Sequence, residues 1–278
     1  MLFSITDEEK ALQLSVVFKN LHLISDIACF TIDDAGISLQ MMDAGQSCML
    51  DLTLPKDWFS SWTYEAGASS DTATMIVAIN TKVLQKVIDT RSIGQPIKLK
   101  TDELNDNVEI AFGRVENSYE KVFHIPKMDS EPLNMEPDQS DHMVDLVLTT
   151  KCFTMLTKQL SGFGDTVKTA FTDTNISFTA SSPDIGTMVA SVDMDHDVEE
   201  YSIAEGDDVS QLLMLKYIEC MCAFGAFAPE VSLHFSNNRP LYLHYDLTGD
   251  ASESDSGMNH DSHPRLAFYL APMVDDNE

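Results

Sequence analysis

Lysines on four segments of helical periodicity are the residues of this sequence whose type and spacing best suit a binding function, namely contact with phosphate groups. The segments 10–24, 80–91, 149–164 and 211–224 hold eight basic and two acidic residues, a charge of +6 in a chain with a formal net charge of −28. Six lysines stand out: Lys19, Lys82, Lys86, Lys151, Lys158 and Lys216. An acidic chain repels nucleic acid, but segregated ammonium groups contact phosphates without reading bases. Chance, together with the preference of lysine for helices, is the alternative explanation.

Other side chains offer little for catalysis or metal binding. Cys220 and Cys222 have the wrong spacing for a zinc site and lie in an apolar segment. The acidic stretch 193–197 lacks the spacing and the glycine of a calcium loop, which favours a solvated hairpin. Only 12 of the 278 residues are glycine, and no glycine-rich phosphate loop stands out. We therefore expect neither an enzyme nor a cofactor or metal site.

Composition is that of a globular chain. A length of 278 residues with 44% hydrophobic residues suffices for two domains. No apolar run reaches the roughly 18 residues of a membrane span, and the N-terminus lacks the features of a secretory signal. The five cysteines are an odd number, mostly in apolar segments, which favours reduced thiols in an intracellular protein without a membrane partner.

An internal repeat relates two of these lysines, Lys19 and Lys158, by their place in the sequence. Lys19-Asn20-Leu21 precedes Asp26 and Ile37-Ser38, and Lys158-Gln159-Leu160 precedes Asp165 and Ile176-Ser177 at the same spacing. The offset is 139 residues throughout, half of the chain length. A repeat of this length predicts two similar domains in tandem.

Local patterns outline the elements of each half as about two helices and eight strands. Thr6 to Glu9 resembles a capping box, and Asn80 resembles the N-cap of the second helix. Prolines and acidic residues replace periodicity over 119–142. We therefore predict an α+β chain with domains at 1–118 and 143–278, joined by a linker at 119–142. The expected strands are 27–32, 36–41, 48–54, 97–101, 108–115, 143–148, 166–172, 175–180, 230–236, 240–246 and 265–271.

Three segments resemble the proliferating cell nuclear antigen family of DNA sliding clamps. They are Ile37 to Asp43 with Met49 to Leu54, the Leu160 to Asp165 segment, and the C-terminal stretch from Phe268 to Asp276. They occur in the family's order along essentially the whole chain. Identity is modest elsewhere, which fits a divergent member, a viral one included.

The resemblance implies a clamp fold in which each domain contains two βαβββ units, and a homotrimeric ring with helices lining the channel and sheets outside. The six lysines would then face duplex DNA without reading sequence. Edge strands near 108–116 and 186–194 would pair between subunits. A polymerase, a clamp loader and other proteins would insert a peptide into a hydrophobic pocket. By position, that pocket would include Met42, Leu133, Met135, Pro240, Tyr269, Ala271 and Pro272.

The resemblance also implies a processivity factor for DNA replication and repair, in the nucleus or a viral replication compartment. Ser15, Val16, Gln85 and Met155 stand where the family leads us to expect charge, so DNA contact would be weak or remodelled. A subunit of a heterotrimeric checkpoint-type clamp and a monomeric processivity factor remain open. An acidic protein that mimics DNA is an alternative of another class.

Overall fold

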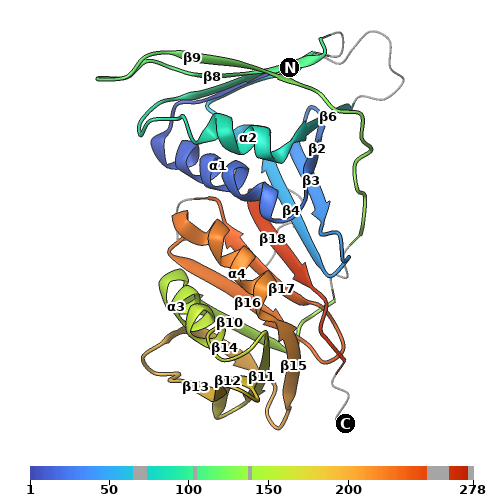
Figure 1. The fold of residues 1–278 in the computed structure, drawn as a ribbon, viewed down its shortest axis with the longest axis vertical. Coiled ribbons are helices and arrows are strands. Elements are labelled where there is room, and N and C mark those ends of the chain that lie inside the picture. Colours follow the sequence, from blue (N-terminus) through green and yellow to red (C-terminus); the bar gives the residue numbers. More distant parts are fainter. Residues whose placement is uncertain (65–73, 103–104, 137–139, 249–262, 275–278) are drawn as a thin grey trace. The chain divides into compact units, whose positions relative to one another are not determined.

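The structure is a computed structural model that describes residues 1–64, 74–102, 105–136, 140–248 and 263–274 (Figure 1). Asp275 and Asp276 of the expected acidic tail, and residues 137–139 of the expected linker, lie outside the described residues. The helices are α1 (Glu8–Asn20), α2 (Thr81–Ile88), α3 (Thr150–Leu160) and α4 (Leu215–Phe224). Short 3-10 turns are η1 (Leu21–Leu23), η2 (Lys56–Trp58) and η3 (Gly225–Phe227).

The first half of the described chain contains nine strands, and so does the second half. The first nine are β1 (Leu2–Ile5), β2 (Ile27–Ile32), β3 (Gly36–Met42), β4 (Cys48–Pro55), β5 (Ser61–Thr63), β6 (Met75–Asn80), β7 (Ile97–Lys100), β8 (Asn107–Phe112) and β9 (Lys121–Pro126). The second nine are β10 (Val144–Thr149), β11 (Thr166–Thr172), β12 (Asn175–Ser182), β13 (Gly186–Val192), β14 (Val198–Ile203), β15 (Val209–Met214), β16 (Glu230–Phe235), β17 (Leu241–Asp246) and β18 (Arg265–Leu270).

Strand pairing repeats between the two halves. β1 pairs with β5 and β7, as β10 pairs with β14 and β16, all antiparallel. β2 pairs with β3 and β6, as β11 pairs with β12 and β15. The repeat read from sequence therefore extends to the whole order of strands and helices. The chain thus has two similar domains in tandem, as expected.

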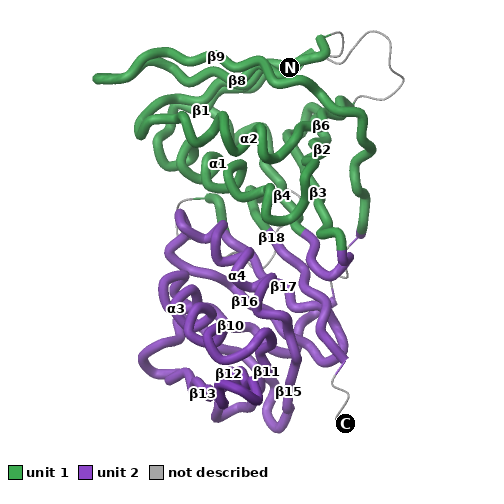
Figure 2. The backbone as a smooth tube through the Cα atoms, in the orientation of Figure 1, with its two compact units in different colours: residues 1–44, 50–135, 246–266 green, residues 45–49, 136–245, 267–278 purple. Residues whose placement is uncertain are grey.

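The chain divides into two compact units (Figure 2). Unit 1 comprises residues 1–44, 50–135 and 246–266, and unit 2 comprises residues 45–49, 136–245 and 267–278. Unit 1 contains the strand orders β5-β1-β7-β8-β9 and β4-β3-β2-β6. Unit 2 contains the orders β14-β10-β16-β17-β18 and β13-β12-β11-β15. A few residues of β4 and β18 belong to the other unit.

Each helix follows a capping residue with extended backbone conformation, and in three of the four helices the side chain of that residue accepts a hydrogen bond from the first turn. Asp7 Oδ1 accepts the Lys10 amide at 2.9 Å, so Asp7, rather than the expected Thr6, caps α1. Asn80 caps α2 as expected, because its Oδ1 accepts the Val83 amide at 3.1 Å. Thr149 caps α3 in the same way. α1 and α2 pack against each other, and so do α3 and α4.

Aromatic contacts join the helices to the sheets within each unit. Phe18 of α1 lies 5.5 Å from Phe30 of β2, measured between ring centroids. In unit 2, the Phe224 ring of α4 lies 5.1 Å from that of Phe268 in β18. Burial of these large apolar side chains is the main favourable term in holding each helix pair on its strands.

Three expectations need correction. The segment 211–224 is not one helix, because Val209–Met214 forms β15, which pairs with β11, and α4 starts only at Leu215. The expected linker begins with β9, in which Phe123 and Ile125 face inward between exposed neighbours. β9 also covers β8, so the edge of that sheet is β9 rather than the expected 108–116.

None of the described helices is long and apolar enough to cross a membrane. Among the described residues, no group of three or more His, Cys, Asp or Glu side chains is arranged to hold a metal ion.

Candidate nucleic-acid and peptide interfaces

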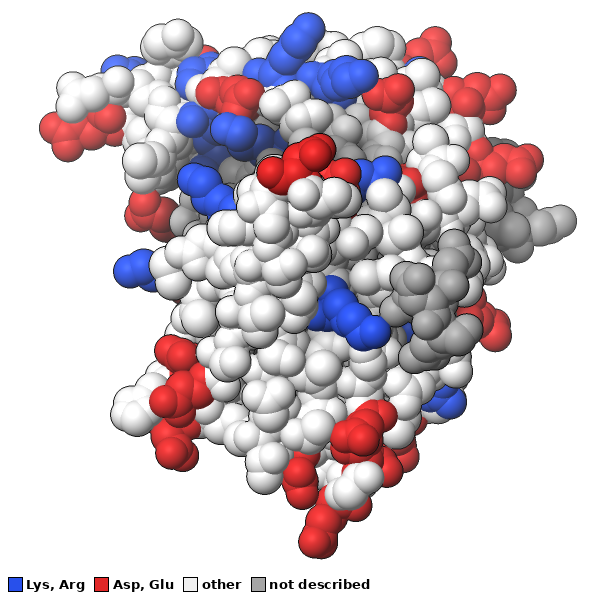
Figure 3. Space-filling view, turned by 60° about the horizontal axis from the view of Figure 1, so that its bottom comes forward, with Lys and Arg blue, Asp and Glu red and all other residues white. Residues whose placement is uncertain are grey.

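All six lysines expected to contact DNA are exposed, and they are shared equally between the units. Lys19 lies on α1, Lys82 and Lys86 lie on α2, and the unit 2 lysines lie on α3 and α4. All six lie within a helix beyond its capping residue, where packing of the opposite, apolar face keeps them in solvent. On the face drawn in Figure 3, basic side chains gather in groups and acidic ones stand beside several of them.

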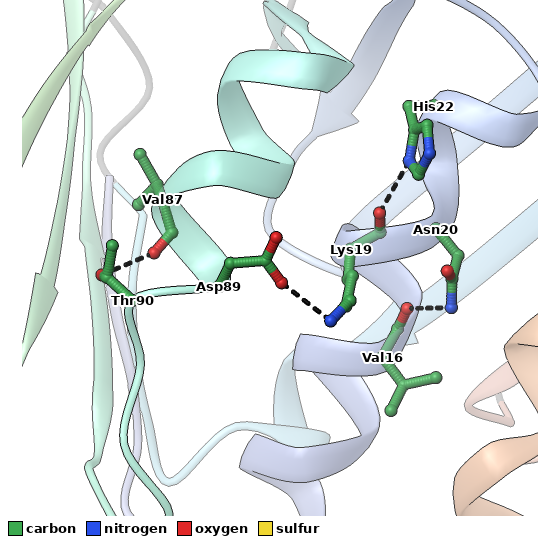
Figure 4. Close-up of polar contacts among 7 residues, drawn as sticks. All are labelled: Val16, Lys19, Asn20, His22, Val87, Asp89 and Thr90. Atoms are coloured by element: carbon green, nitrogen blue, oxygen red, sulfur yellow. Dashed lines mark hydrogen bonds and ion pairs between the residues drawn. The ribbon is translucent and has the colours of Figure 1, made fainter.

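The Lys19 ammonium is engaged within unit 1. Its Nζ lies 2.8 Å from Asp89 Oδ1, across the packed helices α1 and α2 (Figure 4). The Lys19 side chain remains 53% exposed and the Asp89 side chain 43% exposed. Nδ1 of His22 lies 2.9 Å from the Lys19 carbonyl oxygen, where α1 passes into η1. The ion pair is therefore open to solvent, and a phosphate group could reach Lys19 by displacing the carboxylate.

Lys82 is engaged in the same way. Its Nζ lies 2.8 Å from Asp26 Oδ1, and both side chains are mostly exposed. The hydrogen bond from Lys82, together with its charge, lowers the pKa of Asp26 below its ordinary value. Asp26 is therefore ionised at neutral pH, and it neutralises Lys82 at the start of α2.

The other four lysines differ from Lys19 and Lys82. Within the part of the chain that the structure describes, none of Lys86, Lys151, Lys158 and Lys216 makes an ion pair. The Lys216 Nζ lies 4.4 Å from the centroid of the Tyr217 ring, a weak cation–π contact at an exposed site.

Arg91 is one of the basic residues of the segment 80–91, but its side chain is turned into unit 1 and away from solvent. Its Nε donates to the Gln95 carbonyl at 2.8 Å, and its Nη1 donates to Ser15 Oγ at 3.3 Å. Burial lowers the pKa of its guanidinium, which nonetheless keeps its charge at neutral pH. Arg91 therefore serves mainly to join the end of α2 to α1.

A second candidate site lies in unit 1, where two of the expected peptide-binding residues meet. Met42 and Leu133 line one groove of ≈ 550 Å³, together with Gln40, Cys29 and Ser130. Methionine adapts its shape to different ligands, which suits a site for several partners. The structure therefore places Met42 and Leu133 on the same groove.

The segment that carries Leu133 is tied across three strands of unit 1. The Met128 amide donates to Ala78 of β6 at 2.9 Å, and Cys29 of β2 donates to the Ser130 carbonyl at 3.4 Å. Gln40 of β3 then holds Met135 by both backbone groups, at 2.8 Å from the amide and 3.0 Å from the carbonyl. These contacts make the segment one wall of the groove, although Met135 itself does not line it.

The other expected peptide contacts belong to unit 2. Tyr269 of β18 packs on Tyr242 with ring centroids 5.0 Å apart, and Pro240 is exposed just before β17. The Ala271 amide donates to the Ser47 carbonyl at 2.9 Å, and its side chain is exposed. Pro272 follows it, partly buried.

Two family models match the chain in succession. The N-terminal domain of proliferating cell nuclear antigen matches residues 8–139, and the C-terminal domain matches residues 137–253. The chain belongs to the proliferating cell nuclear antigen family. As a family member it is a sliding clamp by fold, with the two tandem domains that the repeat predicts.

A solved structure agrees with this assignment. The chain is similar to a chain in the crystal structure of the PCNA2–PCNA3 complex from Sulfolobus tokodaii, at 18% identity and a TM-score of 0.80. The match covers 98% of this chain and 99% of that one. The whole of this family member therefore follows the clamp fold.

Sequence reasoning found the lysines of this family member but not the carboxylates that engage two of them. Asp89 follows the apolar stripe of α2 directly, and Asp26 stands out in the sequence only as a residue that the repeat shares with Asp165. Neither position signals an ion pair, because Lys19 and Asp89 meet only when α1 packs against α2. The role of Gln40 in holding Met135 also had no local signal in the sequence.

Proposed function

We propose that this chain encircles duplex DNA as a homotrimeric ring and serves as a processivity factor that tethers a DNA polymerase. The observation that carries the proposal is the placement of exposed lysines on paired helices in both units of a clamp fold. Ammonium groups that contact phosphates weakly suit a ring that slides, because they read no sequence. No catalytic step is assigned to the chain.

Two exposed strand edges support self-association. Among the described strands, β9 pairs only with β8 and β13 pairs only with β12. Both edges carry exposed valines, Val122 at 49% and Val189 at 62%. An unpaired edge with apolar side chains is suited to pairing with another chain. We propose that β9 of one subunit pairs with β13 of the next, which closes a head-to-tail ring.

The groove of unit 1 supports peptide capture. We propose that a polymerase, a clamp loader and replication or repair proteins insert apolar anchors at Met42 and Leu133. Met135, Pro240, Tyr269, Ala271 and Pro272 complete the proposed set of contacts. We further propose that the protein acts in the nucleus or in a viral replication compartment.

A topological experiment tests encirclement. The protein is first incubated with linear plasmid, onto whose open ends a ring can thread, and the ends are then ligated to close the circle. The DNA is washed with high salt, and the protein is eluted by cutting the plasmid. We expect retention on the circle and release after the cut, because salt weakens phosphate contacts but does not open a ring. Light scattering across a concentration series should give the mass of three chains. Equal retention on circular and linear DNA, or a monomer at every concentration, would contradict the ring.

Charge reversal tests the helix face. The double variant Lys151→Glu and Lys158→Glu should lose duplex affinity, whereas Lys98→Glu with Lys100→Glu on β7 is the matched control. The control lysines are exposed and lie on a strand rather than on a helix. Equal losses in both variants would show only the effect of net charge.

Peptide capture is tested by fluorescence anisotropy with a synthetic polymerase peptide that carries apolar anchors. Leu133→Ser should weaken binding about tenfold or more, since it removes a buried apolar contact. The control is Val274→Ser, at a residue that is 83% exposed. A heterotrimer subunit would bind a peptide but give no homotrimeric mass, and a DNA mimic would fail both the peptide and the plasmid tests.

A further inference from the structure

The two units offer an internal comparison of their lysines. Lys82 is the second residue of α2, and Lys216 is the second residue of α4. In both units the amide of the first helical residue donates to an aspartate carbonyl, Asp26 at 3.0 Å in unit 1 and Asp165 at 2.9 Å in unit 2. Lys82 and Lys216 are therefore equivalent, and so are Asp26 and Asp165.

The equivalent lysines differ in their partners. Lys82 makes its ion pair with Asp26 at 2.8 Å. Lys216 makes no ion pair with Asp165 among the described residues, and it lies instead over the Tyr217 ring. The same fold position thus holds a neutralised lysine in unit 1 and an ion-pair-free lysine in unit 2.

The second pair of equivalent lysines shows the same difference. Lys19 and Lys158 are related by the 139-residue repeat. Asp89, the partner of Lys19, is the ninth residue from the start of α2, and the ninth residue from the start of α4 is Ala223. Unit 2 therefore has no carboxylate at the position from which Asp89 holds Lys19.

Fold stability does not account for the carboxylate of Asp89. Asp89 is the C-cap of α2, where the negative end of the helix dipole disfavours a carboxylate. Asp26 differs, because it lies beside the first turn of α2, where the positive end of the dipole favours a carboxylate. Ion pairs as exposed as these contribute little to stability.

We propose that Asp26 and Asp89 compete with DNA phosphates for Lys82 and Lys19, so that their equivalents Lys216 and Lys158 in unit 2 contribute more to the DNA contact than Lys82 and Lys19 do. This inference rests on the proposed function. Because each exposed pair is weak, phosphate can displace the carboxylate, and the aspartates reduce the affinity without abolishing it. The reduction limits the grip on DNA, which favours sliding.

A double-mutant cycle on Lys19 and Asp89 tests the competition. Duplex affinity is measured by anisotropy over a salt series for the wild type, Asp89→Asn, Lys19→Met and the double variant. We expect Asp89→Asn to raise the affinity about two- to fivefold and the salt slope by about 0.9 for each lysine released. Lys19→Met should cost less in the wild type than in the Asp89→Asn background, where the lysine is available.

Two further variants separate competition from net charge. Asp34→Asn removes one negative charge from an exposed turn and is the matched control for Asp89→Asn. Ala223→Asp should create the missing carboxylate in unit 2 and lower the contribution of Lys158. Equal gains from Asp34→Asn and Asp89→Asn, without coupling to Lys19, would overturn the inference.

Lys158→Met, together with the wild type, distinguishes failure of the inference from failure of the proposed function. Loss of affinity on Lys158→Met without coupling between Lys19 and Asp89 would overturn the inference alone. Duplex binding that is insensitive to Lys158→Met would overturn the inference, and absence of duplex binding and of plasmid retention in the wild type would overturn the proposed function and the inference with it.

Discussion

Replacing Asp89 by asparagine should leave the stability of unit 1 almost unchanged. The variant loses an exposed ion pair of the kind that contributes about 0.2–1 kcal/mol. It also removes a carboxylate from the C-terminal end of α2, where the helix dipole costs about 0.3–1 kcal/mol. The backbone bond from the Asp89 amide to Gln85, at 2.8 Å, does not depend on the side chain. The two effects offset each other to within about 0.5 kcal/mol.

Lys19→Met is the matched variant, and it should destabilise unit 1, whereas Asp89→Asn should leave the stability almost unchanged. It breaks the same ion pair but leaves the Asp89 carboxylate at the end of α2. It also removes a cation from the last turn of α1, where the dipole favours one. Lys19→Met should therefore cost about 1 kcal/mol, although the two variants break the same contact.

Tryptophan fluorescence during urea unfolding measures both variants in the full chain. The only two tryptophans, Trp58 and Trp62, both belong to unit 1, so the signal reports on that unit. Trp58 is buried and its indole donates to the Leu247 carbonyl at 3.0 Å, so unfolding should shift its emission. A loss above about 1.5 kcal/mol for Asp89→Asn, or equal losses for both variants, would refute the reasoning because the pair would then be structural.

Three further predictions concern stability and reactivity. A Cβ on residue 36 would lie 2.2 Å from the Leu54 carbonyl oxygen, so Gly36→Ala should lower the urea midpoint by the equivalent of about 2–5 kcal/mol, and an unchanged midpoint would contradict this close approach. The hydrogen bond from His234 lowers the pKa of Asp145, so its stabilisation is present above the ordinary value of 3.8 and is lost as pH falls through the folded value. Urea midpoints of wild type and Asp145→Asn should therefore differ at pH 6 and converge as the pH is lowered further and further below 3.8, and a constant difference would be contrary evidence. Burial raises the pKa of Cys222 to about 11, so mass spectrometry should find it alkylated far more slowly at pH 8 than an unfolded control, and equal rates would disprove its protection.

Local signals predicted those elements whose ends are set by local chemistry. Asn80 predicts the start of α2 because its side chain accepts a hydrogen bond from the amide three residues ahead. The turn before Gly36 likewise predicts the boundary between β2 and β3. The segment 209–214 gave no such signal. Its leucines fit a helix as well as a strand, and only pairing with β11, about 40 residues away, makes it β15. The same limit applies to β9, which becomes a strand because β8 offers it an unpaired edge.

For the candidate site, too, features set by local sequence could be predicted, and features set by distant contacts could not. Exposed lysines on amphipathic helices could be identified from spacing alone, because the opposite apolar face fixes which side meets solvent. Their electrostatic state could not, since it depends on carboxylates contributed by other elements. Lys19 meets a residue that is 70 positions away in the sequence, and the contact exists only in the packed pair of helices.

Comparison of the two units distinguishes residues that the shared fold requires from residues that occur in one unit alone. Both units keep a lysine at the second position of the later helix and the same backbone bond to an aspartate, so these features follow from the shared architecture. The carboxylate on the last turn is present as Asp89 in unit 1 and is replaced by Ala223 in unit 2, although both helices pack in the same way. A residue that the architecture does not require, at a helix end that disfavours its charge, is better explained by its effect on Lys19 than by stability. The difference between the units is therefore where regulation of the DNA contact should first be sought.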